Sequence, residues 1–293
     1  MSDLITRTAK LQPRARRTKA MPSFATTYLF EADDNPELGN LYIVLEVLVN
    51  AKQGQDVADL IIETVGQYYY NEEHGHEELL PRFEKAIKAA NVALSDFTDK
   101  GHGGWVGRLS AVIAIIAKGE LHVTGSGSAE AHIYRANRVS HITDGIQAGG
   151  PHRPINTFGN IASGKLQEKD RILLATPALF HQIPTNDLKS IIEDSTPNSA
   201  ITKLSELIAN DEDADRIAAI LTEATTANAL AMKSRPSEPD EIQIGQTDKP
   251  LDIARAAAAP AIAGVVNKTK EFGSIAANHT KTNLIPKARS SAL

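Results

Sequence analysis

Apolar runs near the middle of the chain predict a group of antiparallel strands. Leu109–Ala117 and Leu121–Thr124 are separated by the turn Lys118-Gly119-Glu120, and the first run is rich in β-branched residues. A corner of small residues, Ser126-Gly127-Ser128, then leads to a third run that ends at Arg135. Runs this short between turn residues favour strands over buried helices. We therefore expect a β-meander at the centre of the fold.

The segments around this meander show both helical and strand-like patterns. Apolar residues recur every three or four positions over 57–70 and 79–97, which predicts two helices that each bury one face. The remaining pattern predicts strands at 23–31, 40–48, 138–143, 170–176 and 216–222, and short helices at 188–192 and 201–208. Because strands and helices are segregated along the chain, we expect an α+β fold of stacked antiparallel sheets covered by helices.

The two ends of the chain differ in character from the middle. Residues 1–22 contain the basic, proline-interrupted segment Arg7–Lys19 without the apolar run of a signal peptide, which predicts a flexible basic tail or a contact with an anionic partner. Residues 226–293 read as a linker and a tail of low order, with a weak alanine-rich helix over 253–268. One domain is expected over 23–225, and whether the chain is a fragment of a longer protein stays open.

Composition narrows the class of protein. With 42% hydrophobic and 23% charged residues among 293, the chain can bury a sizeable core. A net charge of −5 gives no general attraction to nucleic acid, and the run 256–266 is too short to span a bilayer. The absence of cysteine excludes disulfides, thiolate zinc sites and cysteine nucleophiles. A cytoplasmic location fits these features.

Two segments carry a resemblance to a known family. The corner and strand over 127–135 read Gly-Ser-Ala-Glu-Ala-His-Ile-Tyr-Arg, and 164–176 follow the pattern Gly-x-Leu-x-x-x-Asp-x-Ile-Leu-Leu-x-Thr. This frame resembles the PPM-type metal-dependent protein phosphatases, which are protein phosphatase 2C-like, and the resemblance extends over about 23–223. It implies a four-layer α-β-β-α sandwich with helices 57–70 and 79–97 on one outer face and 188–208 on the other. It also implies a site for two Mg²⁺ or Mn²⁺ ions that activates water against a phosphoserine or phosphothreonine.

The positions that match the family's metal ligands have mostly lost their carboxylates. The bridging aspartate falls on Glu46, the aspartate of the Gly-Asp-Ser-Arg corner on Ser128, and that of the Ser-Asp-Gly segment on Pro177. The last family aspartate is kept as Asp215, and the adjacent Arg216 could neutralise it. Two dications need several anionic oxygen ligands, so Glu46 and Asp215 would hold at best one hydrated cation.

Three functional hypotheses follow from these positions. The first is a degenerate member of the family, a pseudophosphatase with no catalytic residues and no cofactor, which binds a protein partner such as a phosphoprotein or a kinase. An active serine/threonine phosphatase with a divergent Mg²⁺ or Mn²⁺ site is the second, and an unrelated scaffold is the third. Loss of ligands favours the first over the second, and agreement of several segments in order disfavours the third.

Other polar clusters have simpler explanations. His74-Gly75-His76-Glu77-Glu78 lacks the i, i+4 histidine spacing of helical zinc sites and is explained by an acidic helix start. Ser126-Gly127-Ser128 is not a Gly-x-Ser-x-Gly nucleophile elbow, and we expect a close-packed bend there. Gly101-His102-Gly103-Gly104 lacks the Lys-Ser/Thr of a phosphate-binding loop.

Overall fold

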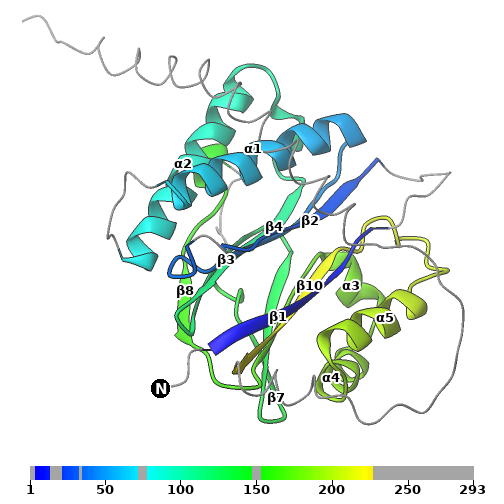
Figure 1. Ribbon diagram of the computed structural model, residues 1–293. Coiled ribbons are helices and arrows are strands. Elements are labelled where there is room, and N and C mark those ends of the chain that lie inside the picture. Colours follow the sequence, from blue (N-terminus) through cyan, green and yellow to red (C-terminus); the bar gives the residue numbers. More distant parts are fainter. Residues whose placement is uncertain (1–3, 14–21, 33–34, 72–77, 147–152, 227–293) are drawn as a thin grey trace, which may run out of the picture. The chain divides into compact units, whose positions relative to one another are not determined.

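Two five-stranded antiparallel sheets carry the fold (Figure 1). The computed structural model describes residues 4–13, 22–32, 35–71, 78–146 and 153–226. The strands are β1 (Leu4–Leu11), β2 (Phe24–Phe30), β3 (Asn40–Val47), β4 (Leu109–Ala117), β5 (Glu120–Ser126), β6 (Glu130–Arg135), β7 (Arg138–His141), β8 (Ala162–Lys165), β9 (Arg171–Ala175) and β10 (Ala219–Thr226). The first sheet has the order β2-β3-β4-β5-β8, and the second has the order β1-β10-β9-β6-β7.

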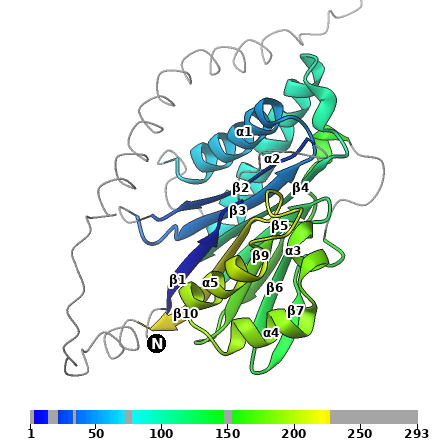
Figure 2. The ribbon, with the colours of Figure 1, turned by 90° about the vertical axis from the view of Figure 1, so that its right-hand side faces the viewer.

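Helices cover the outer face of each sheet (Figure 2). They are α1 (Ala51–Tyr69), α2 (Leu79–Asp99), α3 (Pro177–Gln182), α4 (Thr185–Glu193) and α5 (Pro197–Leu207), with short 3₁₀ turns at Gly103–Trp105 and Pro154–Asn156. The predicted apolar stripes bury α1 and α2 against the first sheet, while α3 to α5 pack on the second. The predicted α+β fold, a four-layer α-β-β-α sandwich, is therefore confirmed.

The central strands β3 and β4 of the first sheet are buried on both faces. Along β3, Leu41, Ile43 and Leu45 pack toward the helices, whereas Tyr42 and Val44 pack toward the second sheet. This double burial explains why β3 and β4 read as nearly continuous apolar runs rather than as an alternating pattern. Glu46 follows Val44 in the same alternation, so a carboxylate enters the space between the sheets.

The expected flexible tail over residues 1–22 is wrong for β1. This strand pairs antiparallel with β10, from Leu4 opposite Thr226 to Leu11 opposite Ala219. Arg7 donates to Glu223 at 2.7 Å, which shows that a basic residue in this segment is an ion-pair partner within the sheet. An edge strand can keep charged residues because one of its sides is unpaired. The predicted tail over 226–293 and its helix over 253–268 lie, apart from Thr226, outside the described residues.

The last strand also differs from its predicted bounds. It spans Ala219–Thr226 instead of 216–222, because residues 212–216 form turns that bring Asp215 and Arg216 to the end of the sheet. Asp215 and Arg216 therefore lie in irregular backbone just before β10. Side chains in such a turn need not alternate between two faces as they do along a strand.

Leu11→Ala should destabilise the protein by about 2 kcal/mol, at the lower end of the range for buried leucine. Leu11 is 4% exposed and packs in the core beneath α5, whereas Ile5 on the same strand is 37% exposed. Ile5→Ala is the matched control and should cost less than about 1 kcal/mol. Urea unfolding of the full chain measures both. Equal, negligible losses would show that β1 does not belong to the folded core.

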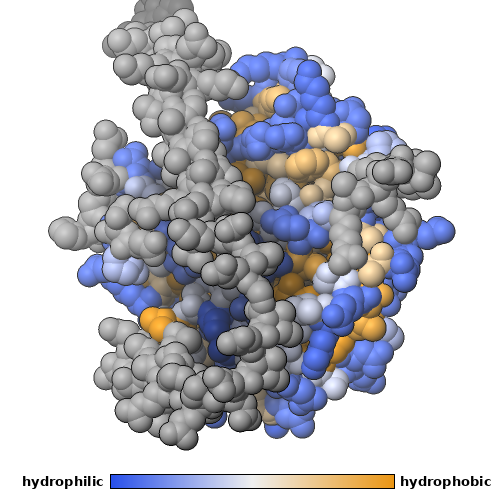
Figure 3. Space-filling view, turned by 45° about the vertical axis from the view of Figure 1, so that its right-hand side comes forward, coloured by the Kyte–Doolittle hydropathy of each residue, from blue (hydrophilic) through white to orange (hydrophobic). Residues whose placement is uncertain are grey.

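Among the residues that the structure describes, no helix is long and apolar enough to cross a membrane. The face drawn in Figure 3 intersperses hydrophobic and hydrophilic side chains. Within the described part of the chain, the exposed large hydrophobic residues come from separate elements, namely Ile5, Tyr68, Val92, Ile155 and Leu207. Scattered single exposures of this kind are ordinary for a folded domain and need no ligand to explain them.

Candidate functional site

Glu46 lies at the end of β3 and faces the second sheet. Its carboxylate is buried, with the residue 2% exposed, and it accepts a hydrogen bond from Arg216 Nε at 2.5 Å. Arg216 also donates through Nη1 to Asp213 Oδ1 at 3.2 Å. One guanidinium therefore links a buried carboxylate and a half-exposed one. Arg216 was expected to neutralise the adjacent Asp215. In the structure its guanidinium pairs with Glu46.

Burial raises the pKa of Glu46 above its ordinary value, and the Arg216 guanidinium opposes that shift through its hydrogen bond and charge. The carboxylates of Asp213 and Asp215 raise the pKa of Glu46 further. Sequence reasoning found Glu46 and Asp215 but missed Asp213. The only sequence signal for Asp213 was its place in the acidic run 211–215 just before Arg216.

The other positions matched to the family's ligands lie in the same network of contacts. Ser128 is exposed at the β5–β6 corner, and its backbone N–H donates to Ser110 Oγ at 3.2 Å. Ser110 stands directly opposite Glu46 in the β3–β4 register. The structure thus brings the Ser128 corner to the strand that neighbours Glu46.

Pro177 is the first residue of α3 and follows directly on Thr176. The Thr176 hydroxyl donates to the carbonyl of Arg216 at 2.8 Å and accepts from Ala218 N–H at 3.0 Å. Asp215, 9% exposed, precedes Arg216 in the turn. Backbone contacts therefore join the Pro177 position to the segment that carries Asp215 and Arg216.

The donors at these positions do not fit a pair of dications. Ser128 offers a neutral hydroxyl, Pro177 offers no side-chain oxygen, and Glu46 is engaged by a guanidinium. Hard cations such as Mg²⁺ and Mn²⁺ need several oxygen ligands with compensating negative charge. The carboxylate of Asp215 is kept, but Arg216 supplies positive charge at Glu46, and two carboxylates with a guanidinium beside them do not compensate four positive charges.

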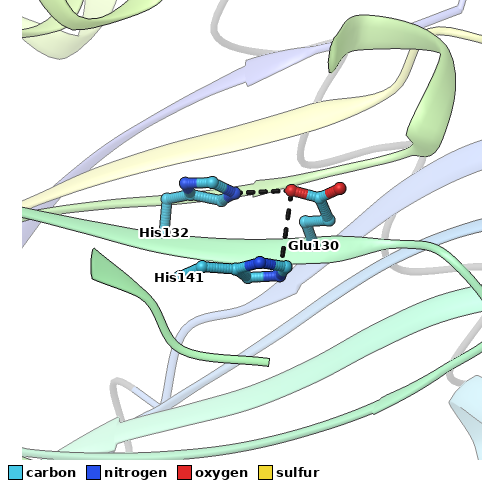
Figure 4. Close-up of side chains that lie close together, drawn as sticks. All are labelled: Glu130, His132 and His141. Carbon is cyan, nitrogen blue, oxygen red and sulfur yellow. Dashed lines mark hydrogen bonds and ion pairs between the residues drawn. The ribbon is translucent and has the colours of Figure 1, made fainter. Parts of the chain in front are cut away.

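A second cluster of ligating side chains lies on β6 and β7. Glu130, His132 and His141 place one ligand atom each within 4.8 Å of one another (Figure 4). His132 Nε2 lies 2.6 Å from Glu130 Oε2, and His141 Nε2 lies 3.7 Å from the same oxygen. Sequence reasoning did not single out these residues, although Glu130 and His132 alternate on one strand and so share a face.

The side chain of His132 is largely buried among other side chains. Its ring stacks between those of His141 and Phe180, with centroids at 4.7 and 4.9 Å. Burial lowers the pKa of His132 below its ordinary value, against the opposing effect of the hydrogen bond with Glu130. The neutral imidazole is thereby favoured, which is the form that binds metal ions.

Comparisons with known proteins show which solved structures share this fold. No protein-family profile and no curated protein sequence matches the chain. The serine/threonine phosphatase PstP/Ppp of Mycobacterium tuberculosis matches with a TM-score of 0.57 at 12% identity, covering 76% of this chain and 99% of that one. Its catalytic domain in complex with two manganese ions matches with the same TM-score and identity, over 77% and 100% of the two chains.

Two further solved structures have the same fold. PppA, a key regulatory component of T6SS in Pseudomonas aeruginosa, matches with a TM-score of 0.53 at 14% identity, over 76% of this chain and 98% of that one. The PPM Ser-Thr phosphatase MsPP of Mycobacterium smegmatis, in complex with cacodylate, gives a TM-score of 0.50 at 14% identity, over 78% and 100%. At such identities these likenesses establish the fold, and the fold expected from the sequence frame is confirmed.

Proposed function

We propose that this chain, which has the fold of the PPM-type serine/threonine phosphatases, is a degenerate member of that family that binds a protein partner without hydrolysing phosphate. The observation that carries the proposal is the ion pair between Arg216 and Glu46. Glu46 stands at the position that matches the family's bridging aspartate, and the guanidinium of Arg216 forms an ion pair with its carboxylate. The domain then acts as a binding module.

The electrostatic argument is one of charge compensation. Two dications about 4 Å apart repel each other strongly unless close anionic ligands offset them. Glu46, Asp213 and Asp215 are the carboxylates near this point, and Arg216 already neutralises part of their charge. A first cation would have to displace the partly exposed Arg216 guanidinium from Glu46, and a second would find little negative charge left.

The partner class that we infer is a phosphoprotein or a kinase, since the fold is one that binds phosphorylated protein segments in active enzymes of this type. The side chain of Arg216 is 22% exposed beside Glu46, the position matched to the family's bridging aspartate, and guanidinium groups pair well with phosphate. No catalytic residue and no cofactor is assigned, and cytoplasmic residence is proposed on the composition alone.

A second candidate function is an active phosphatase with a divergent Mg²⁺ or Mn²⁺ site. It is favoured by the one observation that Asp213 and Asp215 both act on the buried carboxyl of Glu46, which gives three carboxylates near one point. In that case a metal would have to outcompete Arg216 for Glu46.

Phosphatase assays of the full chain separate the two functions. With Mn²⁺ or Mg²⁺, the unmodified protein should hydrolyse p-nitrophenyl phosphate no faster than the Glu46→Gln/Asp215→Asn variant, because its residues would not hold the two cations that activate water in such a site. Circular dichroism of both proteins confirms folding. Metal-dependent turnover by the unmodified protein that the double substitution abolishes would establish the divergent enzyme instead. Ser128→Asp/Pro177→Asp restores two carboxylates and is the converse test.

A further inference from the structure

The cluster of Glu130, His132 and His141 lies on a different face from Glu46. His132 pairs with Leu173 in the β6–β9 register, and Leu173 belongs to the core under α3 to α5. Side chains of directly paired residues share a face of the sheet. The stacking of Phe180, from α3, on His132 agrees with this placement. The cluster is thus on the helix-covered side of the second sheet, whereas Glu46 lies between the sheets.

Strand pairing holds the three side chains together. Glu130 and His132 are two residues apart on β6, and His141 on β7 stands directly opposite His132. Thr143, just after β7, accepts the N–H of Ala131 at 3.0 Å, and its hydroxyl lies 2.9 Å from His141 Nε2. The backbone therefore fixes the positions of the three residues that carry the ligand atoms, which is part of the preorganisation that a metal site requires.

The donor set indicates the class of ion. Two imidazoles and one carboxylate are the ligands of three-residue zinc sites, which leave a fourth position for water or another ligand. Bonds of about 2.0–2.1 Å place tetrahedral ligand atoms about 3.3 Å apart. The observed separations from Glu130 Oε2, 2.6 Å to His132 and 3.7 Å to His141, lie on either side of that value.

Binding requires one small movement. The two imidazole planes are 11° from parallel, and a shared ion must lie near both planes, so the rings must open. His132 is held between Phe180 and His141, whereas the side chain of His141 is 35% exposed, so the tilt is assigned to His141. Metal bonds would then replace the His132–Glu130 hydrogen bond and the contact of His141 Nε2 with the Thr143 hydroxyl.

We propose that Glu130, His132 and His141 form a binding site for a zinc-type transition-metal dication. The site is separate from the positions matched to phosphatase ligands, and the proposal does not rest on the proposed function. Three protein ligands would leave a fourth position for water or for a donor from a bound molecule.

Calorimetric titration of the chelator-treated full chain with Zn²⁺ tests the proposal, with Co²⁺ as a visible-absorption probe of coordination. Every protein carries His74→Ala and His76→Ala, which removes a competing histidine pair outside the described residues. One equivalent of Zn²⁺ should bind. Glu130→Gln and His141→Ala should each weaken binding by at least about tenfold, since outer-shell changes alone cost about 10–100-fold.

A matched control is present on β5. Glu120 and His122 have the same i, i+2 spacing, with 3.8 Å between His122 Nε2 and Glu120 Oε2, but no third ligand of this kind joins them among the described residues. Glu120→Gln should leave Zn²⁺ affinity unchanged. The proposal is overturned if the parent protein binds no Zn²⁺, or if Glu130→Gln and His141→Ala bind it as tightly as the parent does. Melting curves without metal show that each variant is folded.

Discussion

Arg216→Ala should lower the free energy of unfolding at pH 7 by about 3 kcal/mol, the cost of leaving a buried charge without its partner. Glu46 is 2% exposed, and its carboxylate accepts a hydrogen bond from the positively charged Arg216 through Nε. Because Arg216 itself is partly exposed, the figure is taken from the lower end of the range for buried pairs. Denaturant titration of the full chain gives the loss directly.

The pH dependence of that loss identifies its cause. In the variant, burial and the Asp213 and Asp215 carboxylates still raise the pKa of Glu46, without the opposing guanidinium. A folded-state pKa above the unfolded value means that stability is fully present below the unfolded pKa, about 4.3, and falls as pH rises through the folded pKa. The deficit of the variant should therefore shrink on acidification from pH 7.

Two controls accompany Arg216→Ala. Asp213→Ala removes the half-exposed partner of the same guanidinium and should cost less than about 1 kcal/mol. Glu46→Gln in the Arg216→Ala background removes the buried charge and should recover part of the loss at pH 7. If Arg216→Ala is as stable as the unmodified protein at pH 7, the pair does not hold the buried carboxylate.

Gly127→Ala should destabilise the protein by about 3 kcal/mol, through a strained backbone and a steric clash. Gly127 forms the corner between β5 and β6, which connects the two sheets, with φ of +64°. A Cβ there would lie 2.3 Å from the carbonyl oxygen of Leu109 and 2.8 Å from Ser110 Oγ. Close packing at this corner agrees with the bend expected from the small residues, and thermal unfolding measures the effect.

Two other glycines separate the contributions to that loss. Gly145 has φ of +75° with nothing within 4 Å of a Cβ, so Gly145→Ala should show only the conformational cost of about 1 kcal/mol. Gly164 has equal space without a positive φ, and Gly164→Ala should be nearly neutral. Equal losses at Gly127 and Gly145 would contradict the clash with Leu109.

The sequence predicted the fold where burial dominates the pattern. The stripe of Val57, Ile61 and Val65 specified α1 because a one-sided apolar helix has one way to bury its face. The prediction from sequence failed for β1. Arg7 and Lys10 indicated a charged tail, although Ala9 and Leu11 alternate with them and are buried. An edge strand satisfies its polar residues through partners far along the chain, and those partners are not visible locally.

The candidate sites show the same limit. The pair of Arg216 and Glu46 spans 170 residues, whereas sequence adjacency had suggested Asp215 as the carboxylate to be neutralised. Glu130, His132 and His141 lie on one short hairpin, so their proximity could have been predicted from the sequence, although it was not. The two-residue turn Ala136-Asn137, with φ of 47° and 64°, sets the register that puts His141 opposite His132.

The pairing of β1 with β10 also sets an order of assembly during synthesis. Every strand of the first sheet lies between residues 24 and 165, whereas the second sheet joins residue 4 to residue 226. At about 5–20 residues per second, a ribosome needs roughly 10–40 s after making Leu11 to reach Ala219. Throughout that interval β1 has no partner strand, because β10 does not yet exist. The half of the domain that carries the histidine cluster is therefore completed last.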